Sequence, residues 1–316
     1  MRIHILSLAL AIDLLLGEPP NRWHPVAWMG SLIGWARRRA EARLARPGAD
    51  PANAAGPDRR GEALLLGTAI AAGGMGLSAG LGWAALRLCR CLPAPLYALA
   101  VALLIKSTFS IRGLDRAAGE VQAALEAGDL PEARRRLAWH LVSRDTRRLD
   151  QSQVAAAAIE SVAENTGDGI VAPLLAAAAG GAPLALAYRC ANTADAMLGY
   201  HTPQLEWLGK APARLDDLLN LLPARLSGLL IVLAAPLGGG SPRRAWEVMR
   251  RDARLTASPN AGFPMSAMAG ALDLRLEKLG HYVLHPGGRS AAAGDIRRAR
   301  RILRGAAGLA LLVSAG

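Results

Sequence analysis

The feature that most constrains the fold is an uncharged run from Ala63 to Leu86. Its 24 residues would make a helix about 36 Å long, because an α-helix rises about 1.5 Å per residue. The hydrocarbon core of a bilayer is about 30 Å thick, so the run predicts a membrane-spanning helix. Gly76 and Gly80 within it form a G-x-x-x-G pattern that is typical of close helix packing.

The composition agrees with a membrane protein built from helices. Hydrophobic residues make up 52% of the 316-residue chain, and the mean hydropathy is +0.21, above the usual range of soluble domains. Aromatic residues are only 4%, so the core must be formed by small side chains on packed helices. We expect an all-α, polytopic bundle of membrane helices, folded as a single membrane-embedded domain over residues 1–316.

Two further segments are expected to be membrane helices. Residues 1–17 resemble a signal peptide, but Asp13 interrupts the apolar run and no small-residue cleavage site follows, so a retained helix is predicted. A carboxylate inside such a helix is costly, which makes Asp13 a functional candidate. Residues 92–111 form a second span whose one charge is Lys106. That amine could reach the interface or bind an anionic substrate, and the first role is favoured.

The region after residue 168 is apolar but interrupted. Residues 169–188 carry no charge, yet Gly-Gly-Ala-Pro at 180–183 should break or kink a helix there. Residues 226–237 are also apolar, and residues 305–316 could be part of a last membrane segment. Whether the first two cross the membrane stays open, with re-entrant helices favoured because every acidic cluster would then share the cytoplasmic side.

The net charge of +12 comes from arginine-rich segments between the apolar runs. Basic loops beside membrane helices predict the cytoplasmic side. Nucleic acid is not an expected partner, since no zinc or stacking-aromatic pattern accompanies the arginines. One such segment, 35–62, is rich in Arg, Pro and Gly and is predicted to be a surface linker. The three cysteines, Cys89, Cys91 and Cys190, suggest neither a disulfide framework nor a zinc site.

Residues 112–150 are amphipathic and charged, and they predict a cytoplasmic helical hairpin. Asp129 and Glu132 have capping-box spacing, so the second helix should begin there and end near residue 141. Asp150, three residues before Gln153, is a similar cap for the helix that follows.

The segment 155–169 places acidic side chains in an apolar helix. Glu160 and Glu164 are four residues apart, so both project from one helix face, about 5–6 Å apart at Cβ. In apolar surroundings an isolated carboxylate would protonate or find a cation, so a bound metal ion or a cationic group is expected here, whereas a helix end in water would leave both carboxylates solvated. Asn165 and Gly167 tolerate left-handed backbone, so the helix should end there with Asp168 in a tight turn.

The pattern N-T-x-D occurs at 165–168 and again at 192–195. Two oxygen-rich turns would suit Mg²⁺, which takes carboxylate oxygens and shares its shell with substrate phosphates. Asp216 and Asp217 form a further carboxylate pair within a charged cluster that could equally be an ordinary juxtamembrane belt. His24 lies in an interfacial loop and could be an acid, a base or a ligand, although a structural role is the common one.

Six blocks of the sequence together resemble one known family. They are DLLLGEPPNRWHPVAWMG, SRDTRRLD, AAIESVAENTGDGIVAP, NTADAMLGY, ARLDDLLNLLPARL and SPNAGFPMSAMAGAL, and they extend over nearly the whole chain. The chain is similar to the adenosylcobinamide-phosphate synthases, the membrane protein family of cobalamin biosynthesis. Glu18 stands where the family is expected to have Asp, which keeps the carboxylate.

The resemblance implies an integral enzyme of the cell (inner) membrane with several spans. It would be an ATP-dependent acid–amine ligase that joins adenosylcobyric acid to aminopropanol phosphate, or to aminopropanol, through an amide. The implied cofactors are Mg²⁺ and ATP as co-substrate, and the partners are the corrinoid, the amine and the lipid bilayer. A homo-oligomer and partner proteins of the same pathway stay open, and no residue is assigned to the corrin.

Within that activity, each acidic or basic cluster has an expected role. The expected catalytic residues are Glu164, Asp168 and His24. The expected metal ligands are Glu160, Glu164, Asp168 and Asp195, with Asp216 and Asp217 as a second site. The expected substrate- and phosphate-binding residues are Arg144, Asn165, Asn192, Arg214, Arg225 and Asn260.

Two other functions remain open at this stage. A Mg²⁺-dependent intramembrane transferase of the prenyl-diphosphate type would also place aspartates on helices, but its repeated D-x-x-x-D spacing is absent. A membrane sensor or assembly subunit of the same fold would use the acidic turns only structurally. Metal-dependent binding of adenosylcobyric acid would separate the enzyme from the sensor.

Overall fold

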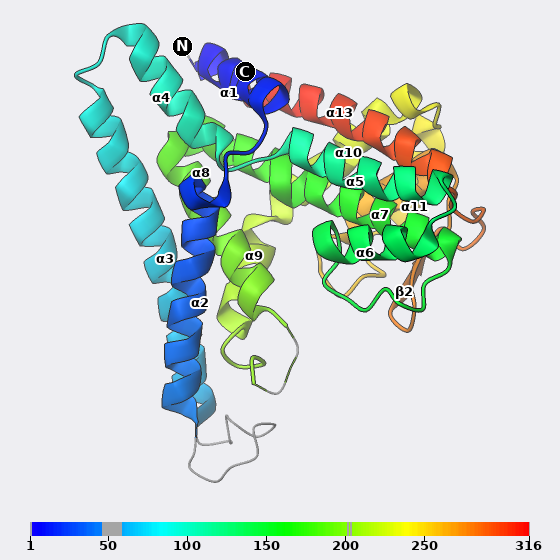
Figure 1. Ribbon diagram of the computed structural model, residues 1–316, viewed down its shortest axis with the longest axis horizontal. Helices are drawn as coiled ribbons and strands as arrows, with labels where there is room; N and C mark the ends of the chain where they lie inside the picture. The colour runs from blue at the N-terminus through cyan, green and yellow to red at the C-terminus, as the bar shows by residue number, and fades with distance from the viewer. Residues whose placement is uncertain (1, 46–58, 201, 203, 316) are drawn as a thin grey trace. The chain divides into compact units, whose positions relative to one another are not determined.

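The computed structural model describes residues 2–45, 59–200, 202 and 204–315. The sequence predicts one membrane-embedded domain, and contacts divide the chain into two units (Figure 1). Unit 1 comprises Met1–Phe109 and Pro173–Leu219, and unit 2 comprises Ser110–Ala172 and Asn220–Gly316. Each unit therefore combines segments that are distant in sequence.

Unit 1 is made of helices. They are α1 (Arg2–Leu16), the short 3-10 helix η1 (Asn21–Trp23), α2 (Pro25–Leu44), α3 (Arg60–Cys89), α4 (Ala94–Lys106), nearly all of α8 (Ala172–Leu198) and α9 (Lys210–Leu219). Helix α1 packs on α4, while α3 packs on α2 and α9 (Figure 1).

Close packing of α3 uses other glycines than the predicted pair. A side chain at Gly67 would meet the backbone of Leu208, and one at Gly82 would meet Pro183. At Gly76 and Gly80 no described atom lies within 4 Å of an added Cβ, so the G-x-x-x-G prediction is wrong for the described contacts. The reason is the helical period, which puts these two glycines on the face opposite Gly67.

The predicted break in the apolar segment 169–188 is confirmed. Gly181 has φ 70° and ψ −163°, a conformation outside the helical region that glycine adopts without a steric penalty. Pro183 follows within α8 and has no backbone N–H to donate. The segment is thus two helices joined at a kink.

The linker predicted over 35–62 is shorter than expected at both ends. Helix α2 continues to Leu44, and α3 already begins at Arg60. The extension is stabilised by the Arg37–Glu41 ion pair one turn apart and by burial of Ala40. Residues 46–58, the rest of this prediction, lie outside the described residues.

Unit 2 surrounds one buried helix. Its elements are α5 (Ile111–Glu126), α6 (Leu130–His140), α7 (Gln151–Thr166), the π-helix η4 (Gly167–Val171), α10 (Leu221–Ala234), the 3-10 helix η5 (Ala235–Gly238), α11 (Pro242–Asp252), α12 (Gly262–Leu272), β1 (Leu276–Lys278), β2 (Tyr282–Leu284) and α13 (Ala293–Ala315). Helix α7 packs on α5, α12, α13 and β1. Its alanines are almost fully buried, so neighbours approach closely on every side.

The predicted helical hairpin is confirmed as α5 and α6. The Asp129 side chain accepts a hydrogen bond of 2.9 Å from the Glu132 backbone N–H, which caps α6. Asp150 and Gln153 form the predicted capping box at the start of α7, with reciprocal bonds of 2.8 and 2.9 Å. Local capping chemistry therefore sets both helix starts.

The predicted helix end at Gly167 is wrong. Gly167 has right-handed backbone (φ −70°, ψ −68°), and the chain continues through the π-helix η4 into α8. Ile170 and Val171 are fully buried here, so an ended helix would leave backbone groups without water or partners. Asp168 consequently lies on a helix instead of in a tight turn.

The all-α prediction is confirmed, with the antiparallel hairpin of β1 and β2 as an addition. Within the described part of the chain, three helical stretches are long and apolar enough to cross a membrane, namely Arg60–Cys89, Gln151–Leu198 and Leu221–Gly238. The predicted span over 92–111 corresponds to α4. This helix meets the length and hydropathy expected of a membrane span only together with α5, across a bend of 41°.

Candidate functional site

The buried carboxylate of Glu160 is the centre of the candidate site in unit 2. Glu160 is only 5% exposed, and its Oε2 lies 3.3 Å from Nη2 of Arg144, which comes from the loop between α6 and α7. Its Oε1 is buried and makes no hydrogen bond to any described atom. A guanidinium group thus supplies the cation that the sequence pattern requires, and one carboxylate oxygen retains its accepting capacity.

Tyr282 of β2 belongs to the same cluster and is absent from the site residues predicted from the sequence. Burial, followed by the charges of Glu160 and Glu164, raises the pKa of Tyr282 above its ordinary value. The hydroxyl therefore stays protonated and can donate a hydrogen bond. The available signal was the pair of short β-type runs around Gly280, which predicts a hairpin.

Two polar side chains extend this cluster along α7. Ser161 Oγ donates to the Leu141 carbonyl at 2.8 Å, which fixes the end of α6 against α7. Asn165 Nδ2 donates to the Ser161 carbonyl at 2.9 Å and contacts Ser161 Oγ at 3.2 Å. Asn165 is exposed and Glu164 half-buried, so this end of the cluster is open to solvent.

Arg225 and Asn260, both predicted to bind phosphate, lie together in unit 2. Arg225 Nη1 is 3.4 Å from Asn260 Oδ1 and donates to the Leu221 carbonyl at 2.6 Å. Its guanidinium lies 4.4 Å from the centroid of the Phe263 ring. Arg225 is exposed, so these contacts orient a cation whose other donors can reach a ligand.

The predicted metal ligands are divided between the units. Glu160, Glu164 and Asp168 belong to unit 2, whereas the predicted aspartates at 195, 216 and 217 belong to unit 1. Among the described residues, no three His, Cys, Asp or Glu side chains are grouped closely enough to hold a metal ion. Mg²⁺ commonly binds through one or two carboxylates together with substrate phosphates. The half-buried Glu164 and Asp168 fit a site of this kind, which is shared with a phosphate. The described residues do not fit a site made of protein ligands alone.

In unit 1, Asn192 and Asp216 are brought together. Asn192 Nδ2 donates to Asp216 Oδ1 at 3.2 Å, while its Oδ1 accepts from Arg189 Nη1 at 3.1 Å. Arg189 was missed, although it is the first charge after twenty uncharged residues. Arg214 lies 4.0 Å from Asp217, at the surface.

Neither N-T-x-D segment is a turn, contrary to the prediction. Thr166 ends α7 and Thr193 lies within α8. Each threonine hydroxyl donates to the carbonyl four residues earlier, at 2.7 Å in both cases. Each hydroxyl thus has a hydrogen-bond acceptor within its own helix, so both N-T-x-D segments remain helical. Asp195 is half-buried on α8.

A second charged cluster lies in unit 1 and includes Asp13, Glu18 and Lys106. Lys106 is 3% exposed, and its Nζ is 2.7 Å from Glu18 Oε1 and 3.4 Å from Asp13 Oδ1. The predicted reach of Lys106 to the membrane interface is therefore wrong. Two carboxylates from the α1 region lie beside the amine and offset part of the cost of burying it.

His24 is held by both ring nitrogens. Its Nε2 lies 2.6 Å from Glu18 Oε2, and its Nδ1 accepts a hydrogen bond of 3.2 Å from the Val26 N–H, which caps α2. This arrangement makes Nε2 the protonated nitrogen of the neutral ring. An acid or base role for His24 would require release of one of these contacts.

Comparisons with known proteins agree with one another. The family model described as CobD/Cbib protein matches residues 6–304. A cobalamin biosynthesis protein CobD of Dehalococcoides mccartyi is 39% identical over 280 residues, covering 89% of this chain and 85% of that protein. CobD of Klebsiella pneumoniae is 38% identical (98% and 95% covered), and the cobalamin biosynthesis protein CbiB of Salmonella typhi is 36% identical (98% and 96%). No solved structure matches significantly.

Proposed function

Because this chain belongs to the CobD/CbiB family of cobalamin biosynthesis proteins, we propose that it joins adenosylcobyric acid to aminopropanol phosphate, or to aminopropanol, through an amide bond. Its role in cobalamin biosynthesis follows from the family, and the ligase reaction is the proposal. The enzyme would work in the cell (inner) membrane, with several spans, at the boundary with the cytoplasm.

Amide formation in water requires an activated carboxyl group. In the proposed reaction, a carboxylate of the corrinoid attacks the γ-phosphate of ATP and gives an acyl phosphate and ADP. The amine then displaces inorganic phosphate from the carbonyl carbon and loses one proton. Both steps handle several phosphate oxygens, and Mg²⁺ bound with ATP would reduce the charge repulsion between them.

The observation that carries the proposal is the cluster of Arg144, Glu160, Glu164 and Tyr282. Arg144 is positioned by the buried Glu160, so its remaining donors can bind a phosphate oxygen. Arg225 supplies a further oriented guanidinium in the same unit. Glu164, on the open side of the cluster, would accept the amine proton, and the Tyr282 hydroxyl would donate to an anionic oxygen.

The test is amide formation by purified, membrane-reconstituted protein with ATP, Mg²⁺, adenosylcobyric acid and each amine in turn. The Glu164→Gln variant should enter the membrane normally but lose at least about 100-fold in kcat, the usual effect of removing a general base. The matched control is Glu247→Gln, which changes an exposed carboxylate on α11 and should leave the rate unchanged.

Two outcomes would refute the proposal. Product that forms without nucleotide would exclude an ATP-dependent ligase, and normal turnover of Glu164→Gln would remove Glu164 from the chemistry. Binding of adenosylcobyric acid that does not depend on a metal, without any turnover, would instead favour a sensor or assembly subunit.

A further inference from the structure

A groove between α2 and α3 of unit 1 has no role in the proposed reaction. It has a volume of about 400 Å³. Buried Ile33 and Ala40 form its floor, and Trp35, Ile70 and Leu77 are among its walls. The lining is apolar along most of its length, and arginine is the one charged residue type among the described residues that form it.

The groove has an apolar end and a basic end. Arg43 of α2 pairs with Glu62 of α3 at 2.7 Å, so the two helices are antiparallel and the C-terminus of α2 meets the beginning of α3. Leu32 and Leu77 line the opposite end. From Leu66 to Leu77 the groove follows α3 for about 16 Å, at about 1.5 Å per residue.

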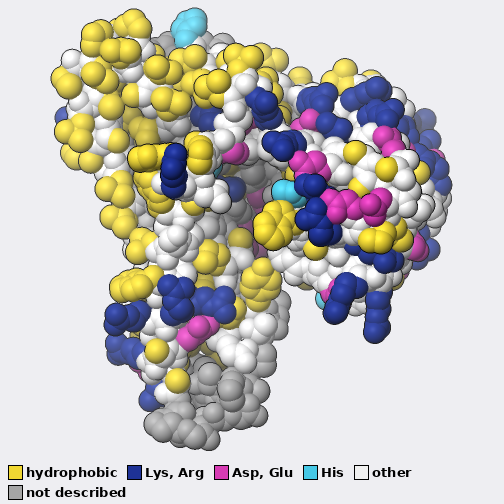
Figure 2. Space-filling model, viewed as in Figure 1, with side chains coloured by type: hydrophobic (Ala, Val, Ile, Leu, Met, Phe, Trp, Pro, Cys, Tyr) yellow, Lys and Arg dark blue, Asp and Glu magenta, His cyan; other side chains and the backbone are white. Residues whose placement is uncertain are grey.

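Two arginines, Arg39 and Arg43, line the basic end. The guanidinium of Arg39 lies 5.5 Å from the centroid of the Trp35 ring, which holds it over the groove. The surrounding sequence from 37 to 62 contains seven arginines and four acidic residues. Figure 2 shows the basic side chains gathered over the lower ends of α2 and α3, below an apolar surface of the same helices.

Helix α3 is long and apolar enough to cross a membrane, and in a membrane the open side of the groove would adjoin lipid. Trp35 and Leu77 are each about half exposed there, at 51% and 49%. We propose that this groove binds one phospholipid with an anionic headgroup, its phosphate on Arg39 and Arg43 and an acyl chain along α3. Paired guanidinium groups suit a phosphodiester, and basic pockets beside membrane helices attract such headgroups.

The glycine at position 73 makes room for the acyl chain. Gly73 lines the groove, and no described atom lies within 4 Å of a Cβ built there. The Cβ of a leucine at this position would meet no described atom, and the rest of its side chain would occupy space in the groove. Gly80 is equally open but does not line the groove, so the same substitution there is a matched control.

The experiment is native mass spectrometry of the full-length protein with phosphatidylglycerol and phosphatidylcholine of identical acyl chains. The wild type should retain phosphatidylglycerol in preference to phosphatidylcholine. Gly73→Leu should lose bound lipid of both kinds, while Gly80→Leu should behave as the wild type. The double variant Arg39→Gln/Arg43→Gln should bind phosphatidylglycerol about 25-fold more weakly, about fivefold per guanidinium, and lose the preference.

Competition measurements distinguish the phospholipid from other ligands of the groove, and they do not depend on catalysis. Excess glycerol phosphate should fail to displace the lipid, because it lacks the acyl chain; displacement would assign the basic end to soluble anions and overturn the proposal. Equal retention of both lipids by the wild type, or unchanged binding by Gly73→Leu, would overturn it as well. Displacement of lipid by adenosylcobyric acid would identify the groove as a corrinoid site instead.

Discussion

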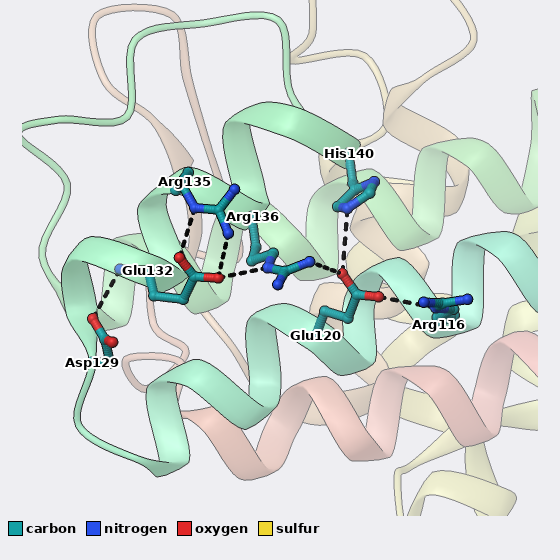
Figure 3. A network of polar contacts seen from close by, with 7 residues as sticks. All are labelled: Arg116, Glu120, Asp129, Glu132, Arg135, Arg136 and His140. Atoms are coloured by element: carbon teal, nitrogen blue, oxygen red, sulfur yellow. Dashed lines mark hydrogen bonds and ion pairs between the residues drawn. The ribbon is translucent and has the colours of Figure 1, made fainter.

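Two charged clusters in this protein pair basic with acidic side chains in opposite surroundings. In unit 1, Lys106 is held between Asp13 and Glu18, and both Lys106 and Asp13 are almost fully buried. In unit 2, the α5–α6 hairpin carries a network at its surface (Figure 3). There Glu132 contacts Arg135 and Arg136 at 2.6 and 2.7 Å, in shorter ion pairs than some of the buried ones.

The comparison teaches that distance is a poor measure of what an ion pair contributes. An exposed pair exchanges good hydration for a screened attraction, and its net effect is small. A buried pair does not stabilise by itself either, but removal of one partner leaves a charge without water. The buried cluster should therefore be sensitive to single substitutions and the surface network tolerant of them.

The largest effect is expected for Lys106→Met. It leaves the carboxylates of Asp13 and Glu18 without their shared cation and should lower the free energy of unfolding by about 3–5 kcal/mol. Chemical unfolding in mild detergent measures this loss. The double variant Asp13→Leu/Lys106→Met should recover part of it, since an apolar pair of similar volume carries no buried charge. Wild-type stability of the single variant would contradict the importance of burial.

An intermediate effect is expected for Arg144→Met in the candidate site. Glu160 is buried, but the Arg144 side chain is 27% exposed, so the loss should be about 1–3 kcal/mol in the same unfolding experiment. Arg144→Met combined with Glu160→Gln should restore most of it. If the single variant is as stable as the wild type, Glu160 is compensated by another group.

The smallest effect is expected in the surface network, and it should depend on pH. Hydrogen bonds from Arg135 and Arg136 lower the pKa of Glu132 to about 2, from its ordinary 4.5. The stabilisation is therefore complete above about pH 4.5 and is lost as the pH falls towards 2. The melting temperatures of Glu132→Gln and wild type should differ slightly at pH 7, and the difference should shrink below pH 4.5 and vanish as the pH falls towards 2. A melting-temperature difference that grows on acidification would contradict the predicted loss of stabilisation.

Features with a local cause could be predicted from the sequence. The long uncharged run gives α3, Asp129 and Asp150 cap the helices that follow them, and the Gly-Pro segment around Gly181 breaks α8. Each depends on neighbours within a few residues, so the physical signal is contained in the sequence itself.

Features of the candidate site that depend on tertiary contacts could be predicted only in part. The Glu160–Glu164 pattern correctly required a cation, but nothing in the sequence selects Arg144 over a metal ion. Lys106 was assigned to the interface because its partners come from the α1 region, far away in the chain. Tyr282 contributes through a hairpin that brings it back to α7, which no local pattern places.

The π-helix between α7 and α8 has a consequence for how this sequence is aligned and altered. One residue more than an α-helical turn offsets every later side chain by about 100° around the axis. A helical wheel continued from α7 past Gly167 therefore assigns residues of α8 to incorrect sides. Deletion of one residue between 167 and 171 would convert this turn into regular helix and turn the side chains that follow it on the same helix by about 100° around the axis. A gap placed there in an alignment therefore changes the orientation of the side chains that follow on the helix, as well as the length of the helix.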